Sequence, residues 1–317
     1  MPFSKSRIVR MGLMVSSLAL LVPRALPQQS SGGDGEEPEN LSDPRAMEFY
    51  GNARTVVNLP LEEAIRRIPH LRGLEPAERQ DELAGILAET GKSVHAFFHD
   101  FPNTACDEKV YEENQFNGGM FQPGHSEKFR YLALNRPTKA VVGLEEFRTD
   151  SEGNLIKPSG SFTTVGFVSM EAVFHPEYQS ESEFRLLGRQ RVKGHETYVV
   201  GFAQIPGKAR IVGKATLGPN GYVLTLVQGA AWIDSKNYQV VRMVTELLAP
   251  RPDIGLKVQS TDLTYEQVHF KSGAKALWLP HEVVVTEKAQ DVVYRSIHTY
   301  SNFRLFRVEA GGKTLPP

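Results

Sequence analysis

The feature that most constrains the fold of this chain is a long series of short β-type segments after Thr104. β-branched and aromatic residues occur there in runs that Gly, Pro and Asn separate, and helical periodicity is absent. Turn sequences such as Pro219-Asn220-Gly221 connect consecutive runs, which predicts an antiparallel meander and not a parallel α/β sheet. The clearest expected strands are residues 197–204, 222–227, 239–247, 257–270, 280–287 and 292–303.

Two helical segments precede these strands. A short apolar pattern from Leu61 to Ile68 lies between Pro60 and Pro69, which are typical of a helix start and a helix end. A longer pattern predicts one helix over about residues 76–100, with Gly91 inside it at a cost of about 1 kcal/mol. Its apolar positions are Leu83, Ile86, Leu87, Val94, Phe97, Phe98 and Phe101, and we expect the three phenylalanines to be buried.

A large antiparallel sheet must cover its apolar face, and the long helix is the available cover. The predicted fold class is therefore α+β, mostly antiparallel β: a curved, incomplete β-barrel wrapped on one or two N-terminal helices. Residues 46–102 would form the helical segment that packs on the sheet, and residues 103–310 the antiparallel half-barrel. Residues 311–317 would be a short tail.

The first residues are typical of an exported protein. Lys5, Arg7 and Arg10 precede an uncharged apolar run, Met11 to Val22, and small and polar residues follow. This run is shorter than the ~20 residues that a membrane-spanning helix needs, so an uncleaved anchor is the weaker alternative. We expect a signal peptide over residues 1–28 and a periplasmic or secreted protein, soluble after its removal and without a stable membrane span. Residues 29–45, rich in Ser, Gly, Glu and Pro, would form a disordered linker.

Charge and cysteine content exclude further classes of protein. Removing residues 1–27 removes four basic residues and no acidic one, so the formal charge changes from −1 to −5. We expect no nucleic-acid partner, because phosphate binding requires a basic face. Cys106 is the only cysteine, so no internal disulfide can form. A small buried side chain is favoured there over a reactive thiol.

One hairpin sequence near the C-terminus resembles a known family. The stretch 229–247 reads GAAWIDSKNYQVVRMVTEL: Trp232-Ile233-Asp234, a turn, then Val240-Val241-Arg242, with Leu279-Pro280 further on. This pattern resembles the outer-membrane lipoprotein-sorting (LolA-like) superfamily over roughly residues 221–307. The resemblance implies an incomplete antiparallel β-barrel closed by helices. Carriers of that family bind lipid chains in an apolar cavity, and related domains of envelope-stress regulators sense lipoproteins or bind partner proteins.

Motifs for catalysis or cofactor binding are missing from the sequence. It has no Gly-x-Ser-x-Gly elbow, no phosphate-binding glycine loop with Lys-Ser or Lys-Thr, and no Cys-x-x-Cys. His95 and His99 have the spacing of metal ligands on a helix, but surface histidines are the favoured interpretation. Acidic residues that could pair for hydrolysis are interpreted as solvent-exposed strand residues: Glu145, Glu146, Glu181 and Glu183. We therefore expect no enzyme, no cofactor and no metal site.

The sequence predicts a cell-envelope protein that binds an apolar ligand, a lipid or an acylated protein, in the half-barrel cavity as a carrier or sensor. The alternative is an interaction module that binds an envelope protein and has a fully packed core. A pocket of roughly 300 Å³ or more between helix and strands would favour the carrier. For Trp232, a core anchor is the favoured interpretation over a lining residue. The candidate lining residues are Phe97, Phe101, Tyr131, Phe167, Trp232, Tyr265 and Trp278.

Overall fold

The structure is a computed structural model. It describes residues 44–135, 143–156, 166–210, 213–217, 221–270, 276–289, 291–308 and 314–315. The expected signal peptide, and all but the last two residues of the expected linker, lie outside the described residues.

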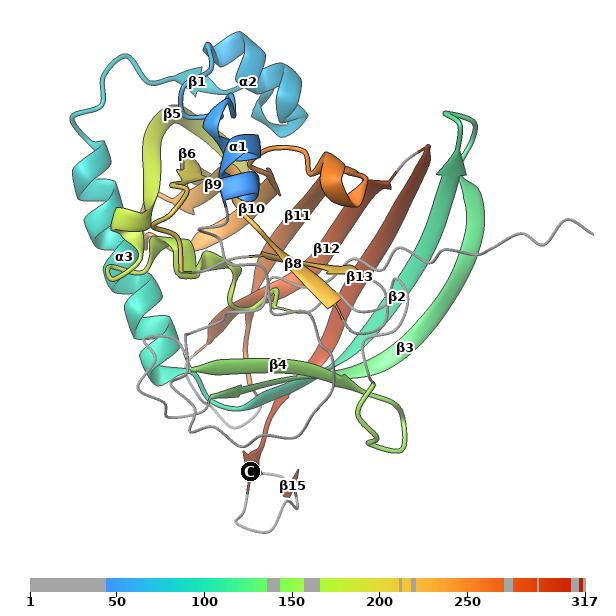
Figure 1. Cartoon of the computed structure of the whole chain (residues 1–317). Coiled ribbons are helices and arrows are strands. Elements are labelled where there is room, and N and C mark those ends of the chain that lie inside the picture. The colour runs from blue at the N-terminus through green and yellow to red at the C-terminus, as the bar shows by residue number, and fades with distance from the viewer. Residues whose placement is uncertain are drawn as a thin grey trace, which may run out of the picture.

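Eleven strands of the described chain form one curved antiparallel sheet that is not closed (Figure 1). The strand order is β1-β5-β6-β9-β10-β11-β12-β13-β2-β3-β4, so β1 and β4 are the edges. The mostly antiparallel β fold expected from the sequence is confirmed. The bounds are β1 (Glu75–Pro76), β2 (Thr104–Phe116), β3 (Gln122–Asn135), β4 (Leu144–Thr149), β5 (Ser182–Val192), β6 (His195–Gln204), β9 (Val227–Asp234), β10 (Val240–Leu247), β11 (Leu256–Val268), β12 (Leu277–Ala289) and β13 (Val292–Leu305).

In the described part of the chain, two further strand pairs lie outside this sheet. One joins β7 (Gly213–Leu217) to β8 (Gly221–Thr225), and the other joins β14 (Arg307–Val308) to β15 (Thr314–Leu315). The main sheet is a meander from β9 to β13, after which β13 pairs with β2 and returns the sheet to the N-terminal strands. In that pairing Tyr300 lies opposite Glu108, a contact between residues far apart in the sequence.

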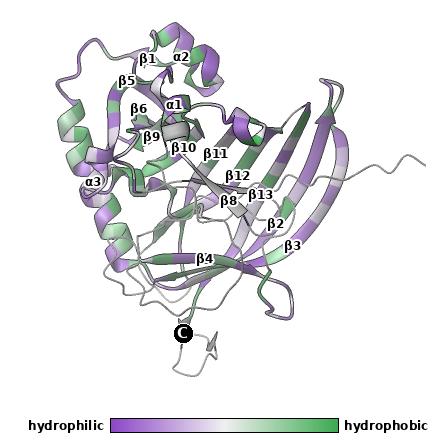
Figure 2. Ribbon diagram, in the orientation of Figure 1, coloured by the Kyte–Doolittle hydropathy of each residue, from purple (hydrophilic) through white to green (hydrophobic). Residues whose placement is uncertain are grey.

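The three α-helices of the described residues all precede the long strands: α1 (Pro44–Gly51), α2 (Leu61–Arg67) and α3 (Leu83–Asp100). Short 3-10 helices are η1 (Pro69–Leu71), η3 (Met170–Phe174), η4 (Gln179–Glu181) and η5 (Pro252–Ile254). Pro60 and Pro69 flank α2 as the sequence predicts. Figure 2 shows hydrophobic and hydrophilic residues alternating along α3, as expected for a helix that is buried on one face.

The expected start of the long helix near residue 76 is wrong. Residues 75–76 instead form β1, in which Pro76 pairs with Gly188 of β5. A side chain at Gly188 would place its Cβ 1.9 Å from the carbonyl oxygen of Glu75, so this approach requires glycine. Further along, the Gln80 amide donates to the Leu186 carbonyl (2.9 Å) and accepts its N–H (2.8 Å). The segment before α3 therefore forms hydrogen bonds with backbone groups of β5 near the edge of the sheet.

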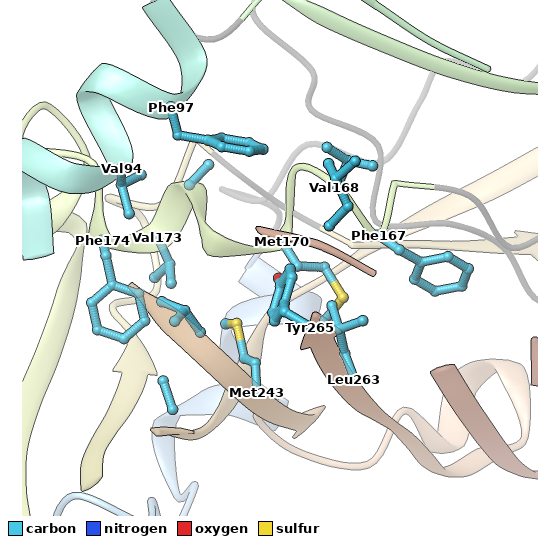
Figure 3. Packing of buried hydrophobic residues seen from close by; sticks show 14 of the residues in the cluster. Val94, Phe97, Phe167, Val168, Met170, Val173, Phe174, Met243, Leu263 and Tyr265 are labelled. Atoms are coloured by element: carbon cyan, nitrogen blue, oxygen red, sulfur yellow. The ribbon is translucent and has the colours of Figure 1, made fainter. Parts of the chain in front are cut away.

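Both faces of the sheet are covered around strands β5, β6, β9 and β10. On one face, α3 packs together with residues 166–174, and Phe97, Phe98 and Phe101 are 8%, 5% and 2% exposed, which confirms their expected burial. Residues 166–174 lie between α3 and strands β10 and β11 (Figure 3). On the other face, α2 and η1 cover strands β5, β6, β9 and β10. No helix of the described residues is long and apolar enough to cross a membrane.

Gly91 allows α3 to pack closely on the segment after η3. A Cβ there would lie 2.8 Å from Nε2 of Gln179 and 3.2 Å from Cγ of Pro176. The same Nε2 donates to the carbonyl oxygens of Leu87 and Phe174, each at 2.8 Å. The glycine that weakens the helix locally is therefore used for contact with another element.

Candidate ligand-binding cleft

A cleft of about 630 Å³ lies between the C-terminal half of α3 and the strand ends beside it. Strands β11, β12 and β13 and the turn between β9 and β10 contribute its other walls. Its largest apolar lining residues are Phe97, Leu277, Trp278 and Leu305. This is the space between helix and strands where the sequence predicts a pocket, and it is larger than the expected minimum.

Polar and charged groups also line this cleft. Glu89 and Lys92 of α3 form an exposed ion pair with 2.6 Å between Oε1 and Nζ. The Gln239 side chain donates a hydrogen bond to the Ser93 hydroxyl, which connects the β9–β10 turn to α3. Asp100 lies at the end of the helix and also lines the cleft. Apolar and charged walls together suit a ligand that is itself amphipathic, with its apolar part against the aromatic rings.

The structure does not bring the seven candidate residues into one cavity. Phe97 and Trp278 line the cleft. Trp232 lies in the cluster on the opposite face of the sheet, and its indole Nε1 donates to Oε1 of Gln190 at 2.7 Å. The remaining four pack inside the main core with 2–3% of their surface exposed: Phe101, Tyr131, Phe167 and Tyr265.

The interior beneath strands β2, β3, β4 and β13 contains a buried charged network that the sequence analysis missed. The Glu108 carboxylate pairs with Arg148 and accepts hydrogen bonds from Nη2 of Arg148 (2.7 Å) and the hydroxyl of Tyr300 (2.9 Å). Burial by itself raises the pKa of Glu108, but the Arg148 charge and these hydrogen bonds outweigh it and lower the pKa to about 2. The carboxylate is therefore ionised throughout the ordinary pH range.

His298 completes this network as a neutral side chain. Burial lowers its pKa, and hydrogen bonding to Glu108 only partly opposes that effect. Nδ1 lies 2.9 Å from Oε1 of Glu108 and Nε2 lies 3.0 Å from the Ser296 hydroxyl. A neutral ring with its proton on Nδ1 can donate to Glu108 and accept from Ser296, which satisfies both nitrogens.

Glu146 anchors the segment that covers the sheet. Its carboxylate accepts hydrogen bonds from the Tyr131 hydroxyl (2.5 Å), the Val168 N–H (3.0 Å), and the Ser169 N–H (3.0 Å) and hydroxyl (2.6 Å). Burial raises its pKa despite these donors. The expectation that Glu146 is a solvent-exposed strand residue is corrected to a half-buried one, because residues 166–169 cover part of its carboxylate, whereas its neighbour Glu145 is exposed.

Other expected surface acids also differ from one another. Glu181 is buried and pairs with Arg210, whereas Glu183 is exposed as expected. Glu171, in η3, is only 3% exposed, and burial raises its pKa to about 8. It is therefore protonated at neutral pH, so the interior holds no carboxylate charge at this position.

The two histidines with the spacing of metal ligands, His95 and His99, each have a side-chain partner, and Nδ1 of His99 lies 2.8 Å from Oδ1 of Asp100. His175 donates from Nε2 to Nδ1 of His95 at 3.0 Å, because Nδ1 of His175 already accepts the N–H of Glu177. No three His, Cys, Asp or Glu side chains within the described ranges could hold a metal ion together. Cys106 is 2% exposed, which confirms the favoured interpretation, and burial raises the pKa of its thiol.

Comparison with known proteins finds likeness at the level of fold. No family model and no curated protein matches the chain. The chain is similar to solved structures from the LolA superfamily. One of them is a LolA superfamily protein from Nitrosomonas europaea, with 12% identity and a TM-score of 0.32 over 71% of this chain and 94% of that one.

Two further solved structures have similar values. An outer-membrane lipoprotein-sorting protein domain from Vibrio parahaemolyticus is 14% identical, with a TM-score of 0.37 over 71% of this chain and 93% of that one. A DUF1329 family protein from Desulfovibrio piger is 13% identical, with a TM-score of 0.37 over 74% of this chain and 95% of that one. These likenesses concern the fold alone.

Proposed function

We propose that this protein is a non-catalytic protein of the cell envelope that binds an apolar or amphipathic ligand, a lipid or an acylated protein, in the cleft beside α3. The cleft itself supports this proposal: its volume of about 630 Å³ lies within the range of small-molecule sites, about 300–1,000 Å³. Phe97 and Trp278 would contact the apolar part of the ligand. The five other candidate residues would instead hold the two sides of the sheet in shape.

The arrangement of charge in the cleft also supports an amphipathic ligand. Lys92 and Glu89 lie one helical turn apart on the outer wall, and their side chains are 71% and 45% exposed. The polar head group of a ligand could replace one partner of this ion pair at a small cost in free energy, since exposed ion pairs contribute about 0–1 kcal/mol to stability. In this proposal the sheet curves around α3, and the helix forms one wall of the binding site.

A fluorescence titration with 1-anilinonaphthalene-8-sulfonate tests the proposal. We expect the probe to bind the folded protein and Ala96→Trp, which fills the cleft from α3, to weaken binding at least about tenfold. Ala88→Trp is the matched control, because Ala88 is exposed on the same helix and does not line the cleft. Equal affinity of all three proteins would refute the cleft as the binding site.

The second candidate is a protein-interaction module without a ligand. The tight burial of Phe101, Phe167 and Tyr265 favours it, because the centre of the half-barrel is filled by protein side chains. Native mass spectrometry of protein purified from its own envelope separates the two. Lipid-sized adducts support the binding cleft, whereas a protein partner with no adduct, together with no probe binding, supports the module.

A further inference from the structure

Exposed apolar side chains gather at one end of the sheet. Four large apolar residues of the described chain are exposed: Met120 (89%), Leu155 (65%), Phe116 (46%) and Val258 (41%). Phe116, Met120 and Val258 lie at the end of the sheet where β2 ends and where β3 and β11 begin. Leu155 lies elsewhere, in the loop after β4.

Strand register shows that these three residues share an end of the sheet. Phe116 pairs with Val292, the first residue of β13, and Val258 pairs with Lys288, near the end of β12. The backbone N–H of Asn117 donates to the carbonyl oxygen of Asp291 at 3.0 Å, which joins the β2–β3 and β12–β13 turns. The β2–β3 hairpin projects from the sheet on the side away from α3 (Figure 1).

The tip of this hairpin is a defined turn. Asn117 and Gly118 both have positive φ, 50° and 71°, as a tight hairpin turn requires. The Gly119 N–H donates to the Phe116 carbonyl at 2.9 Å. Behind the turn, the guanidinium of Arg295 lies 4.1 Å from the centre of the Phe121 ring. Phe116 and Met120 are therefore presented to solvent by an ordered turn.

Charge is absent from the tip and present beside it. Residues 114–124 contain no Asp, Glu, Lys or Arg, although these residues make up 23% of the chain. Lys257 and Lys288 lie at the same end, and Lys257 pairs with Asp291 at 3.6 Å. An uncharged apolar tip with lysines nearby matches the boundary between the acyl chains and phosphates of a lipid layer.

We infer that the β2–β3 tip is a contact site for a phospholipid bilayer, into whose interface Phe116 and Met120 insert. Three exposed apolar side chains are too few for a stable protein interface, which involves about 20–30 residues on each partner. A bilayer needs no matching surface, so a few inserted side chains suffice for weak, reversible binding. The tip is separate from the cleft beside α3, so the inference does not depend on the proposed ligand.

Vesicle flotation of the mature protein tests this inference. With vesicles of phosphatidylethanolamine and phosphatidylglycerol we expect a bound fraction that Met120→Glu reduces at least about fivefold. Leu155→Glu is the control, because it introduces the same charge at an exposed apolar residue elsewhere. Both positions are largely exposed, so both variants should fold, and circular dichroism checks this.

Three outcomes would overturn the inference. They are no vesicle binding by the wild-type protein, an equal loss in the two variants, and binding that disappears in 0.5 M NaCl, which would indicate surface charge and not insertion. A change of oligomeric state in Met120→Glu without vesicle binding would assign the tip to contact between copies. As a positive readout, Met120→Trp should show a blue-shifted emission on adding vesicles.

Discussion

The buried pair of Glu108 and Arg148 allows a quantitative prediction. Their side chains are 0% and 2% exposed, so Glu108→Gln keeps the shape of the side chain but leaves the guanidinium buried without its counter-charge. Removing one partner of a buried pair costs about 3–5 kcal/mol. The pKa of Glu108 gives an independent magnitude. A fall from 4.5 to about 2, at about 1.4 kcal/mol per pH unit, corresponds to about 3 kcal/mol of stability at neutral pH.

The same pKa determines the direction of the pH dependence. Glu108 ionises more readily in the folded than in the unfolded protein, so its stabilisation is complete above pH 4.5 and is lost as the pH falls towards 2. The difference in unfolding free energy between wild type and Glu108→Gln should therefore be largest at neutral pH. It should shrink progressively through this acidic range.

Urea unfolding followed by the fluorescence of Trp232 and Trp278 measures this difference at each pH. Glu82→Gln is the control, because its ion pair with Arg189 is more than half exposed and should contribute less than about 1 kcal/mol. A loss below about 1 kcal/mol for Glu108→Gln at pH 7 would refute the reasoning. A deficit that stays constant down to pH 2 would show that the lost charge is not its cause.

Three further predictions concern α3 and the N-terminus. Gly85→Ala, with open space around its Cβ, should stabilise the protein by about 0.5–1 kcal/mol, whereas Gly91→Ala should not, because its Cβ would meet Gln179; thermal unfolding of both variants checks this. Phe98→Ala should lower the unfolding free energy by about 3–5 kcal/mol, and a loss under 1 kcal/mol would contradict its place in the core. N-terminal sequencing of envelope protein should find a mature start between Ala25 and Ser30, and an intact N-terminus would disprove export with cleavage.

Local structure was largely predictable. The expected strand over residues 292–303 is found as β13 (Val292–Leu305), and two prolines set the ends of α2. These elements depend on side-chain alternation and backbone restriction, which act between residues close in sequence. The start of α3 was misplaced for the opposite reason. Residues 75–76 pair with a strand more than a hundred residues later, and no local pattern reports that pairing.

The candidate site was predictable only in part. Phe97 and Trp278 line the cleft. Trp232, which the sequence also predicts as a lining residue, faces the opposite side of the sheet. Alternation shows that Trp232 and Ile233 point to opposite faces, but not which face meets α3. That choice depends on where the helices pack.

By itself the sequence determined the antiparallel β class, the helices near the N-terminus and the burial of the α3 phenylalanines, because each follows from local periodicity. Only the tertiary structure decided that Glu108 is internal and that the Glu146 carboxylate is partly covered. A polar residue in an alternating strand looks solvent-facing until Arg148 and the segment 166–169 are placed against it. The cleft was decided in the same way, since its walls come from α3, a turn and three strand ends that meet only when the sheet has formed.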